Sequence, residues 1–96
     1  MSRSQTASIL VIDDEEIMRE ILGELLTREG YTVRTASAAS EGIELAKAMP
    51  FDAVILDVML PDMNGLSALE EIRRIDEELP VLMITAFASV ETAISA

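Results

Sequence analysis

The chain has 96 residues, half of them hydrophobic, with 18 acidic and 7 basic side chains and a formal net charge of −11 at pH 7. It contains no cysteine and no histidine, which excludes disulfides, thiol nucleophiles and imidazole bases, and the shortage of Lys and Arg argues against binding to nucleic acid. We expect one domain over residues 1–96, with a polar extension at 1–7, and a cytoplasmic location, because no apolar run approaches the roughly 20 residues of a membrane span.

The first half of the chain alternates strand and helix patterns. Residues 8–12 are a short apolar run rich in β-branched side chains, which predicts a buried parallel strand. Residues 15–29 have apolar side chains at helical spacing and acids in the first turn, which predicts an amphipathic helix. Its expected inward stripe is Ile17, Met18, Ile21, Leu22, Leu25 and Leu26. Residues 31–36 have strand composition, and Ser37 is the expected N-cap of a second helix that Pro50 ends.

The same alternation continues in the second half. Residues 53–56 predict another fully buried strand, which ends in Asp57 and leads into a turn at residues 60–65. We expect Gly65 in this turn to adopt a backbone conformation that is closed to other residues. A third helix follows, with the expected inward stripe Leu66, Leu69, Ile72 and Ile75. Residues 81–84 predict a fourth buried strand, and a further helical pattern follows it.

This alternation predicts an α/β fold, a doubly wound parallel sheet of the flavodoxin-like strand order 2-1-3-4 with helices on both faces. In that order the first and third strands are neighbours, roughly 4.8 Å apart, so Asp13, Asp14 and Asp57 would share one pocket at their carboxyl ends. Three like charges repel one another unless a proton or a cation joins them. Oxygen ligands without His or Cys favour Mg²⁺ or Ca²⁺, and a site open to phosphate oxygens favours Mg²⁺. Because a carboxylate can also form an aspartyl phosphate, the cluster predicts phosphoryl transfer.

A plainer interpretation of the acids at strand ends is that they are helix caps and first-turn charges. This interpretation explains Glu15 and Glu16 fully and extends to Asp14. For the Asp13-Asp14 pair taken alone, the two interpretations stay open.

Three motifs, in this order, resemble the response-regulator receiver family. They are VIDDE at residues 11–15, ILDVMLPDMNG at residues 55–65 and ITA at residues 84–86. The resemblance covers the chain from Ser8 onwards and implies a switch in a two-component system rather than an enzyme. Residues 85–93 are further similar to the NtrC type, whose receivers control a downstream ATPase and a DNA-binding domain and so regulate transcription.

The resemblance also implies roles for single residues. Asp57 is the phosphoryl acceptor, which takes the group from a phosphohistidine on a sensor histidine kinase or from a small phosphodonor. Asp14 would bind Mg²⁺ directly and Asp13 through water. Asp57 and the backbone carbonyl of Met59 would complete the protein ligands. The hydroxyl of Thr85 would move onto a phosphoryl oxygen after the transfer and so couple the chemistry to the loop that follows.

The chain departs from the family pattern in one respect. Family members carry a lysine at the end of a fifth strand, and we expect this chain to be incomplete, without the fifth strand and helix. Its only lysine, Lys47, resembles a surface charge on the second helix. The strand at 81–84 would then leave an apolar edge and an open helix-packing face. We therefore expect a homodimer or other self-association, or poor stability.

Two other functions fit parts of the pattern. A pseudo-receiver would keep the fold as an interaction module that accepts no phosphate; the missing lysine favours it, and the intact site residues argue against it. A phosphatase of the haloacid dehalogenase type would need a second aspartate two residues after its nucleophile. Neither Asp57 nor Asp13 has one.

Overall fold

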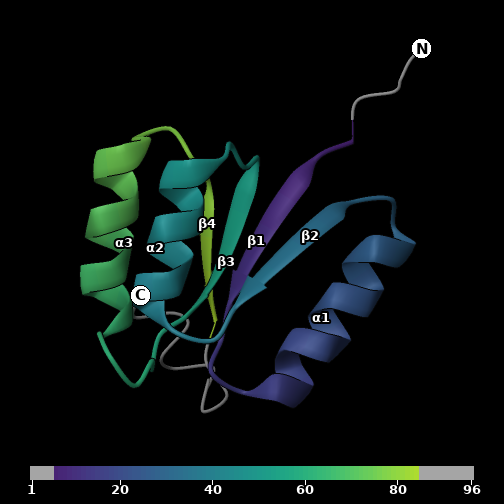
Figure 1. Cartoon of the computed structure of the whole chain (residues 1–96), viewed down its shortest axis with the longest axis horizontal. Helices are drawn as coiled ribbons and strands as arrows, with labels where there is room; N and C mark the ends of the chain where they lie inside the picture. The colour runs from purple at the N-terminus through teal and green to yellow at the C-terminus, as the bar shows by residue number, and fades with distance from the viewer. Residues whose placement is uncertain (1–5, 85–96) are drawn as a thin grey trace.

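The computed structural model describes residues 6–84, which form a four-stranded parallel sheet with helices on both faces (Figure 1). The strands are β1 (Ser8–Ile12), β2 (Thr32–Ala36), β3 (Ala53–Asp57) and β4 (Val81–Ile84). The helices are α1 (Glu16–Arg28), α2 (Ala39–Ala48) and α3 (Gly65–Ile75). The strands are ordered β2-β1-β3-β4 and all pair in parallel, so the predicted strand order is confirmed.

Helices α2 and α3 lie on one face of the sheet, and α1 lies on the other beside β1 and β2 (Figure 1). The hydrophobic core fills the space between the sheet and the α2–α3 layer. Its fully buried side chains include Leu10, Ile12, Val54, Leu56 and Ile72. Alternate residues of β1 and β3 point into this core because successive side chains of a strand face opposite sides of the sheet.

Helix α1 buries less of its apolar stripe than the sequence predicted. None of its 13 residues is buried, and Ile17 is 71% exposed. Met18, Leu22 and Leu26 are half-buried against the sheet. The reason is that α1 packs against β1 and β2 at one side of the sheet, so only part of a wide apolar stripe meets a partner among residues 6–84.

Helix α3 begins at a local cap, but its buried face differs from the prediction. The side chain of Asn64 accepts a hydrogen bond from the backbone N–H of Ser67 at 2.8 Å, which is N-cap geometry. With the helix started there, Ala68 and Ile72 face the core. The prediction that Leu66 faces inward was wrong, since 65% of its surface is exposed. A helix turns by about 100° per residue, so Leu66, six residues before the buried Ile72, points about 120° away from it.

The predicted N-cap of α2 was also wrong. The cap position is Ala38, which has no side-chain acceptor. Ser37 lies one residue earlier, and both its backbone N–H and its hydroxyl donate to Oε1 of Glu41. The acceptor that serves the first turn of α2 comes from elsewhere in the chain and belongs to the candidate site.

Candidate metal centre

Three aspartates meet at the carboxyl ends of β1 and β3. In the sheet, Ile12 of β1 is paired with Leu56 of β3, so the residues after them come together. One carboxylate oxygen from each of Asp13, Asp14 and Asp57 lies within 4.8 Å of the others. The predicted proximity of these three side chains is therefore confirmed.

The three carboxylates differ in their surroundings. Asp13 and Asp57 are buried, with 3% and 6% of their surface exposed, whereas Asp14 is exposed. Oδ1 of Asp13 accepts the backbone N–H of Glu15 at 2.9 Å, and Oδ1 of Asp57 accepts that of Met59 at 3.1 Å. These bonds to the following backbone fix the two buried carboxylates, and Asp14 lies on the solvent side of the cluster.

The backbone of Asp13 is held from two sides. Its N–H donates to the carbonyl of Ala36 at the end of β2, at 3.0 Å. Its own carbonyl accepts a hydrogen bond at 2.8 Å from the guanidinium of Arg19, which comes from the first turns of α1. The last residue of β2 and the start of α1 thus share in positioning the cluster.

Burial raises the pKa of Asp57 above its usual value. The N–H of Met59 opposes this effect, and the negative charges of Asp13 and Asp14 add to it. None of the ion pairs found within residues 6–84 includes a cluster aspartate. They join Glu24 to Arg28, Glu44 to Lys47 and Glu71 to Arg74 on helix surfaces. A set of oxygen ligands that carries this much uncompensated charge suits a hard divalent cation.

The loop between β3 and α3, residues 58–64, is closed at its base. The N–H of Gly65 donates to the carbonyl of Val58 at 2.8 Å, and Met59 forms a bridge with Asn64. Our expectation for Gly65 was wrong, because the only positive φ among the described residues is at Gly30. Glycine is required at position 65 for space: a Cβ there would lie 2.7 Å from Cα of Val58 and 2.9 Å from its carbonyl oxygen.

The tip of the same loop is attached to α2. Asp62 accepts hydrogen bonds from the backbone N–H groups of Ala39 and Ser40, each at 3.0 Å. Both bonds lower the pKa of Asp62. This contact was not predicted from the sequence. Ala38 at the cap position was the available signal that an acceptor must come from elsewhere, but the local sequence does not reveal which residue supplies it.

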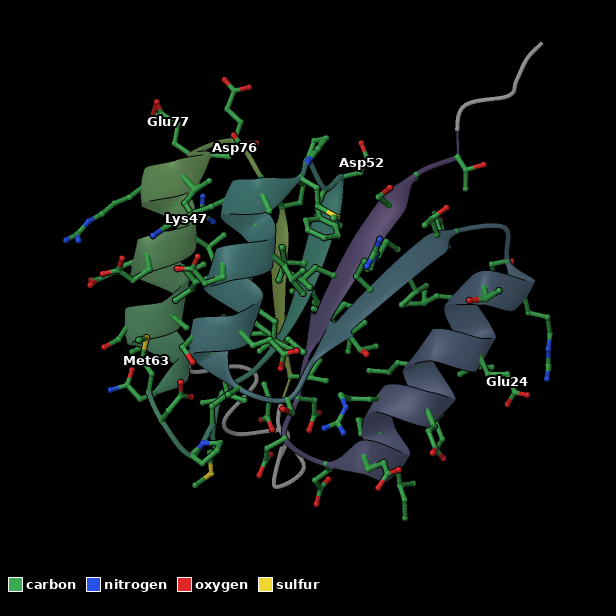
Figure 2. The ribbon with its side chains drawn as sticks, viewed as in Figure 1. Glu24, Lys47, Asp52, Met63, Asp76 and Glu77 are labelled. Carbon is green, nitrogen blue, oxygen red and sulfur yellow. The ribbon has the colours of Figure 1, made fainter. Side chains whose placement is uncertain are left out.

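The remaining predicted site residues lie beside the cluster or outside the described residues. The side chain of Met59 is exposed, and its backbone follows Asp57 by two positions. Thr85 lies outside the described residues; Ile84, directly before it, is paired with Asp57 in the sheet. Figure 2 shows Met63 of the loop at the carboxyl end of the sheet and Asp52, Asp76 and Glu77 at the opposite end. The cluster thus belongs to one end of the sheet only.

The carboxylate cluster lies between the carboxyl ends of two neighbouring strands of a parallel sheet. Doubly wound α/β folds usually bind their ligands at this end of the sheet. The family model of the response regulator receiver domain matches residues 9–96. The chain belongs to this family and is a receiver domain of a two-component response regulator. No helix within residues 6–84 has the length and apolar character that a membrane crossing requires.

Relatives of the chain include transcriptional regulators. It is 42% identical over 91 residues to the probable transcriptional regulatory protein TcrX of Mycobacterium tuberculosis, with 95% of this chain and 39% of TcrX covered. It is 40% identical over 88 residues to the transcriptional regulatory protein ZraR of Escherichia coli, with 92% of this chain and 20% of ZraR covered. The chain therefore spans less than half the length of these relatives.

Solved structures share the fold closely. One of them is the response regulator TrrA from Thermotoga maritima, solved in complex with Mg²⁺-BeF. It superposes with a TM-score of 0.83 at 34% identity, and the match covers 94% of this chain and 78% of the TrrA chain. Another is a response regulator protein from Burkholderia pseudomallei, solved with a phosphorylated aspartic acid, a calcium ion and citrate. It gives a TM-score of 0.82 at 34% identity, and the match covers 92% of this chain and 52% of that protein's chain.

Proposed function

We propose that this chain is a phosphoacceptor receiver, in which Asp57 takes a phosphoryl group from a sensor histidine kinase in a Mg²⁺-dependent reaction. The observation that carries the proposal is the meeting of three carboxylate oxygens within 4.8 Å, one of them on the last residue of β3. The protein acts as a signalling switch of the cytoplasm rather than as an enzyme with a separate substrate.

The residues of the cluster divide the work between metal binding and nucleophilic attack. Asp14 would hold Mg²⁺ directly and Asp13 would hold it through water. Asp57 and the backbone carbonyl of Met59 would be the other protein ligands. The ion would supply positive charge against the charge that builds up on the transferring phosphoryl group. Burial and the neighbouring carboxylates disfavour ionisation of Asp57. A divalent cation at the cluster would favour the ionised, nucleophilic form of this carboxylate.

In the transfer step, a carboxylate oxygen of Asp57 attacks the phosphorus of the donor's phosphohistidine. A P–O bond forms and the P–N bond breaks. The imidazole of the donor keeps the electron pair of that bond and takes up a proton, so an acyl phosphate on Asp57 and a free histidine result. The absence of histidine from this chain agrees with a donor on another protein.

The output is proposed from the relatives and from the sequence. TcrX and ZraR are named as transcriptional regulators, and residues 85–93 are similar to the NtrC type. We therefore place ATPase and DNA-binding domains downstream of this receiver in the full-length protein. Thr85 is the proposed switch residue, whose hydroxyl binds a phosphoryl oxygen after transfer.

The test is to incubate the chain and its full-length parent protein with MgCl₂ and acetyl phosphate and to record intact mass. We expect the full-length protein to gain one phosphoryl group that is labile in base, and its Asp57→Asn variant to gain none. A gain by the full-length protein alone would show that the reaction needs residues outside this chain. The control is Asp76→Asn. Asp76 is an exposed aspartate at the opposite end of the sheet (Figure 2), so this variant should be phosphorylated as the unsubstituted protein is. If the full-length protein gains no phosphate from acetyl phosphate, and none when a phosphorylated histidine kinase is added as a second donor, the pseudo-receiver alternative replaces this proposal.

A further inference from the structure

Asp62 connects two parts of the fold that are far apart in sequence. Its Oδ1 accepts the N–H of Ala39 and its Oδ2 accepts the N–H of Ser40, both at 3.0 Å. We call this pair of hydrogen bonds the Asp62 bridge. It joins the tip of the β3–α3 loop to the first turn of α2.

The bridge satisfies a need of α2 that its own sequence leaves open. The first N–H groups of a helix have no partner within the helix. Ala38 at the cap position offers no side-chain oxygen, and Ser37 bonds to Glu41 instead. A carboxylate that accepts two such N–H groups forms charge-assisted bonds at the positive end of the helix dipole. The lowered pKa of Asp62 agrees with this arrangement.

Each of the two segments that the bridge joins is also bonded to a cluster aspartate. On the loop side, the N–H of Met59 donates to the carboxylate of Asp57. On the α2 side, the carbonyl of Ala36, three residues before Ala39, accepts the N–H of Asp13. The bridge therefore closes a ring that runs from the loop to the Asp57 carboxylate, across the pairing of β3 with β1 to the backbone of Asp13, and on to α2.

We propose that Asp62 is a positioning residue for the metal centre: by tying the loop tip to α2, it holds the backbone at Met59 and the Asp57 carboxylate in the geometry that binds Mg²⁺. This inference rests on the proposed function of the cluster. Without the bridge, the base of the loop is still closed by the contacts of Gly65 with Val58 and of Met59 with Asn64. The tip loses its attachment to α2, so the ligands are less preorganised.

The first test compares Asp62→Ala with the parent chain by isothermal titration with MgCl₂ and by the rate of phosphorylation with acetyl phosphate at several Mg²⁺ concentrations. Removal of residues that orient metal ligands typically weakens metal binding by about 10- to 100-fold. We expect a loss at the lower end of that range, about tenfold. The phosphorylation rate should fall at low Mg²⁺ and return to the parent value when Mg²⁺ is saturating, because the nucleophile itself is unchanged.

A second variant separates positioning from helix capping. Ala38→Ser gives α2 a cap of its own, since Ala38 already has the extended backbone of an N-cap residue. In the double variant Ala38→Ser/Asp62→Ala, we expect the stability lost in Asp62→Ala to recover while Mg²⁺ binding stays weak. Asp62→Asn keeps one acceptor oxygen and should bind Mg²⁺ with intermediate affinity.

The outcomes are distinct. If the double variant regains Mg²⁺ affinity together with stability, or if Asp62→Ala binds Mg²⁺ as the parent does, Asp62 only caps a helix and the inference is wrong. If the parent chain binds Mg²⁺ no better than Asp57→Asn does, the proposed function of the cluster fails first. A parent that binds Mg²⁺ through Asp57 and loses affinity in both Asp62→Ala backgrounds supports the inference.

Discussion

The backbone of Gly42 on α2 lies directly against the side chain of Ile12, the last residue of β1 and the residue before Asp13. A Cβ at position 42 would lie 2.6 Å from Cγ1 of Ile12, which is fully buried. This contact sets how closely α2 approaches the strand that Asp13 and Asp14 directly follow.

Gly42→Ala should therefore destabilise the fold. Overpacking of a buried site costs about 1–3 kcal/mol, which exceeds the gain of about 1 kcal/mol that Ala brings over Gly in a helix interior. Chemical denaturation measures the difference. The matched control is Gly23→Ala on α1, where no atom of residues 6–84 outside the helix's own backbone lies within 4 Å of the new Cβ and the fold should gain stability. Equal effects at the two positions would contradict the packing argument.

Gly65→Ala should destabilise the fold and weaken Mg²⁺ binding together. The new Cβ would meet the backbone of Val58 at 2.7 Å, and backbone cannot move aside as the end of a side chain can. We expect a loss of at least about 1–3 kcal/mol, measured by denaturation without metal, with Mg²⁺ titration as the second readout. An unchanged Mg²⁺ affinity in a folded Gly65→Ala protein would show that the loop base does not position the site.

Asp57→Asn should stabilise the metal-free protein at pH 7. The folded-state pKa of Asp57 lies above its ordinary value of 3.8. Protonation of Asp57 therefore contributes to the free energy of unfolding in full below pH 3.8, and this contribution is lost as the pH rises through the folded-state pKa. At pH 7 the ionised carboxylate costs stability that Asn avoids. Thermal unfolding in EDTA should show a gain for Asp57→Asn at pH 7 that disappears near pH 4. With Mg²⁺ added, the parent should be stabilised more than the variant.

Asp62→Asn should show the opposite dependence on pH. The folded-state pKa of Asp62 is lowered by the N–H groups of Ser40 and Ala39. The carboxylate therefore stabilises the fold above pH 3.8, and this contribution is lost as the pH falls through the folded pKa. The same unfolding series should show that Asp62→Asn is destabilising at pH 7 and nearly neutral at the lowest pH. Parallel curves for the parent and the variant would contradict the bridge.

Self-association of the 96-residue chain stays a prediction, and its most direct structural support is an exposed apolar side chain on β4. Leu82 is 62% exposed at the edge of the described sheet, on the opposite face from the α2–α3 layer. Leu82→Lys places a charge there and should reduce association without loss of fold, because charged edge residues oppose pairing between sheets. Sedimentation velocity at several concentrations measures the effect. A parent chain that stays monomeric throughout would refute the prediction.

The strands and their order followed from the sequence because β1, β3 and β4 are short apolar runs. The fourth strand, β2, was indicated only by its β-branched residues, since most of it is polar and exposed. Asp57 marks the end of β3 and Asp13 follows β1, so the parallel order was enough to bring them together. Details that depend on packing between elements were not accessible. The predicted stripe of α3 was too wide, because Leu66 lies about 120° around the helix from Ile72; Ala68 takes the core position instead. The sequence could not show that Gly65 is needed for space rather than for a positive φ.

The position of the α2 cap also bears on the order in which the protein assembles. The N–H groups of Ala39 and Ser40 obtain their acceptors from a residue that follows β3. Until β3 has paired with β1 and the chain through Asp62 is in place, those groups remain hydrated and the first turn of α2 frays. We therefore expect the first turn of α2 to form late, after a contact of long sequence separation has formed, and contacts of that kind slow folding.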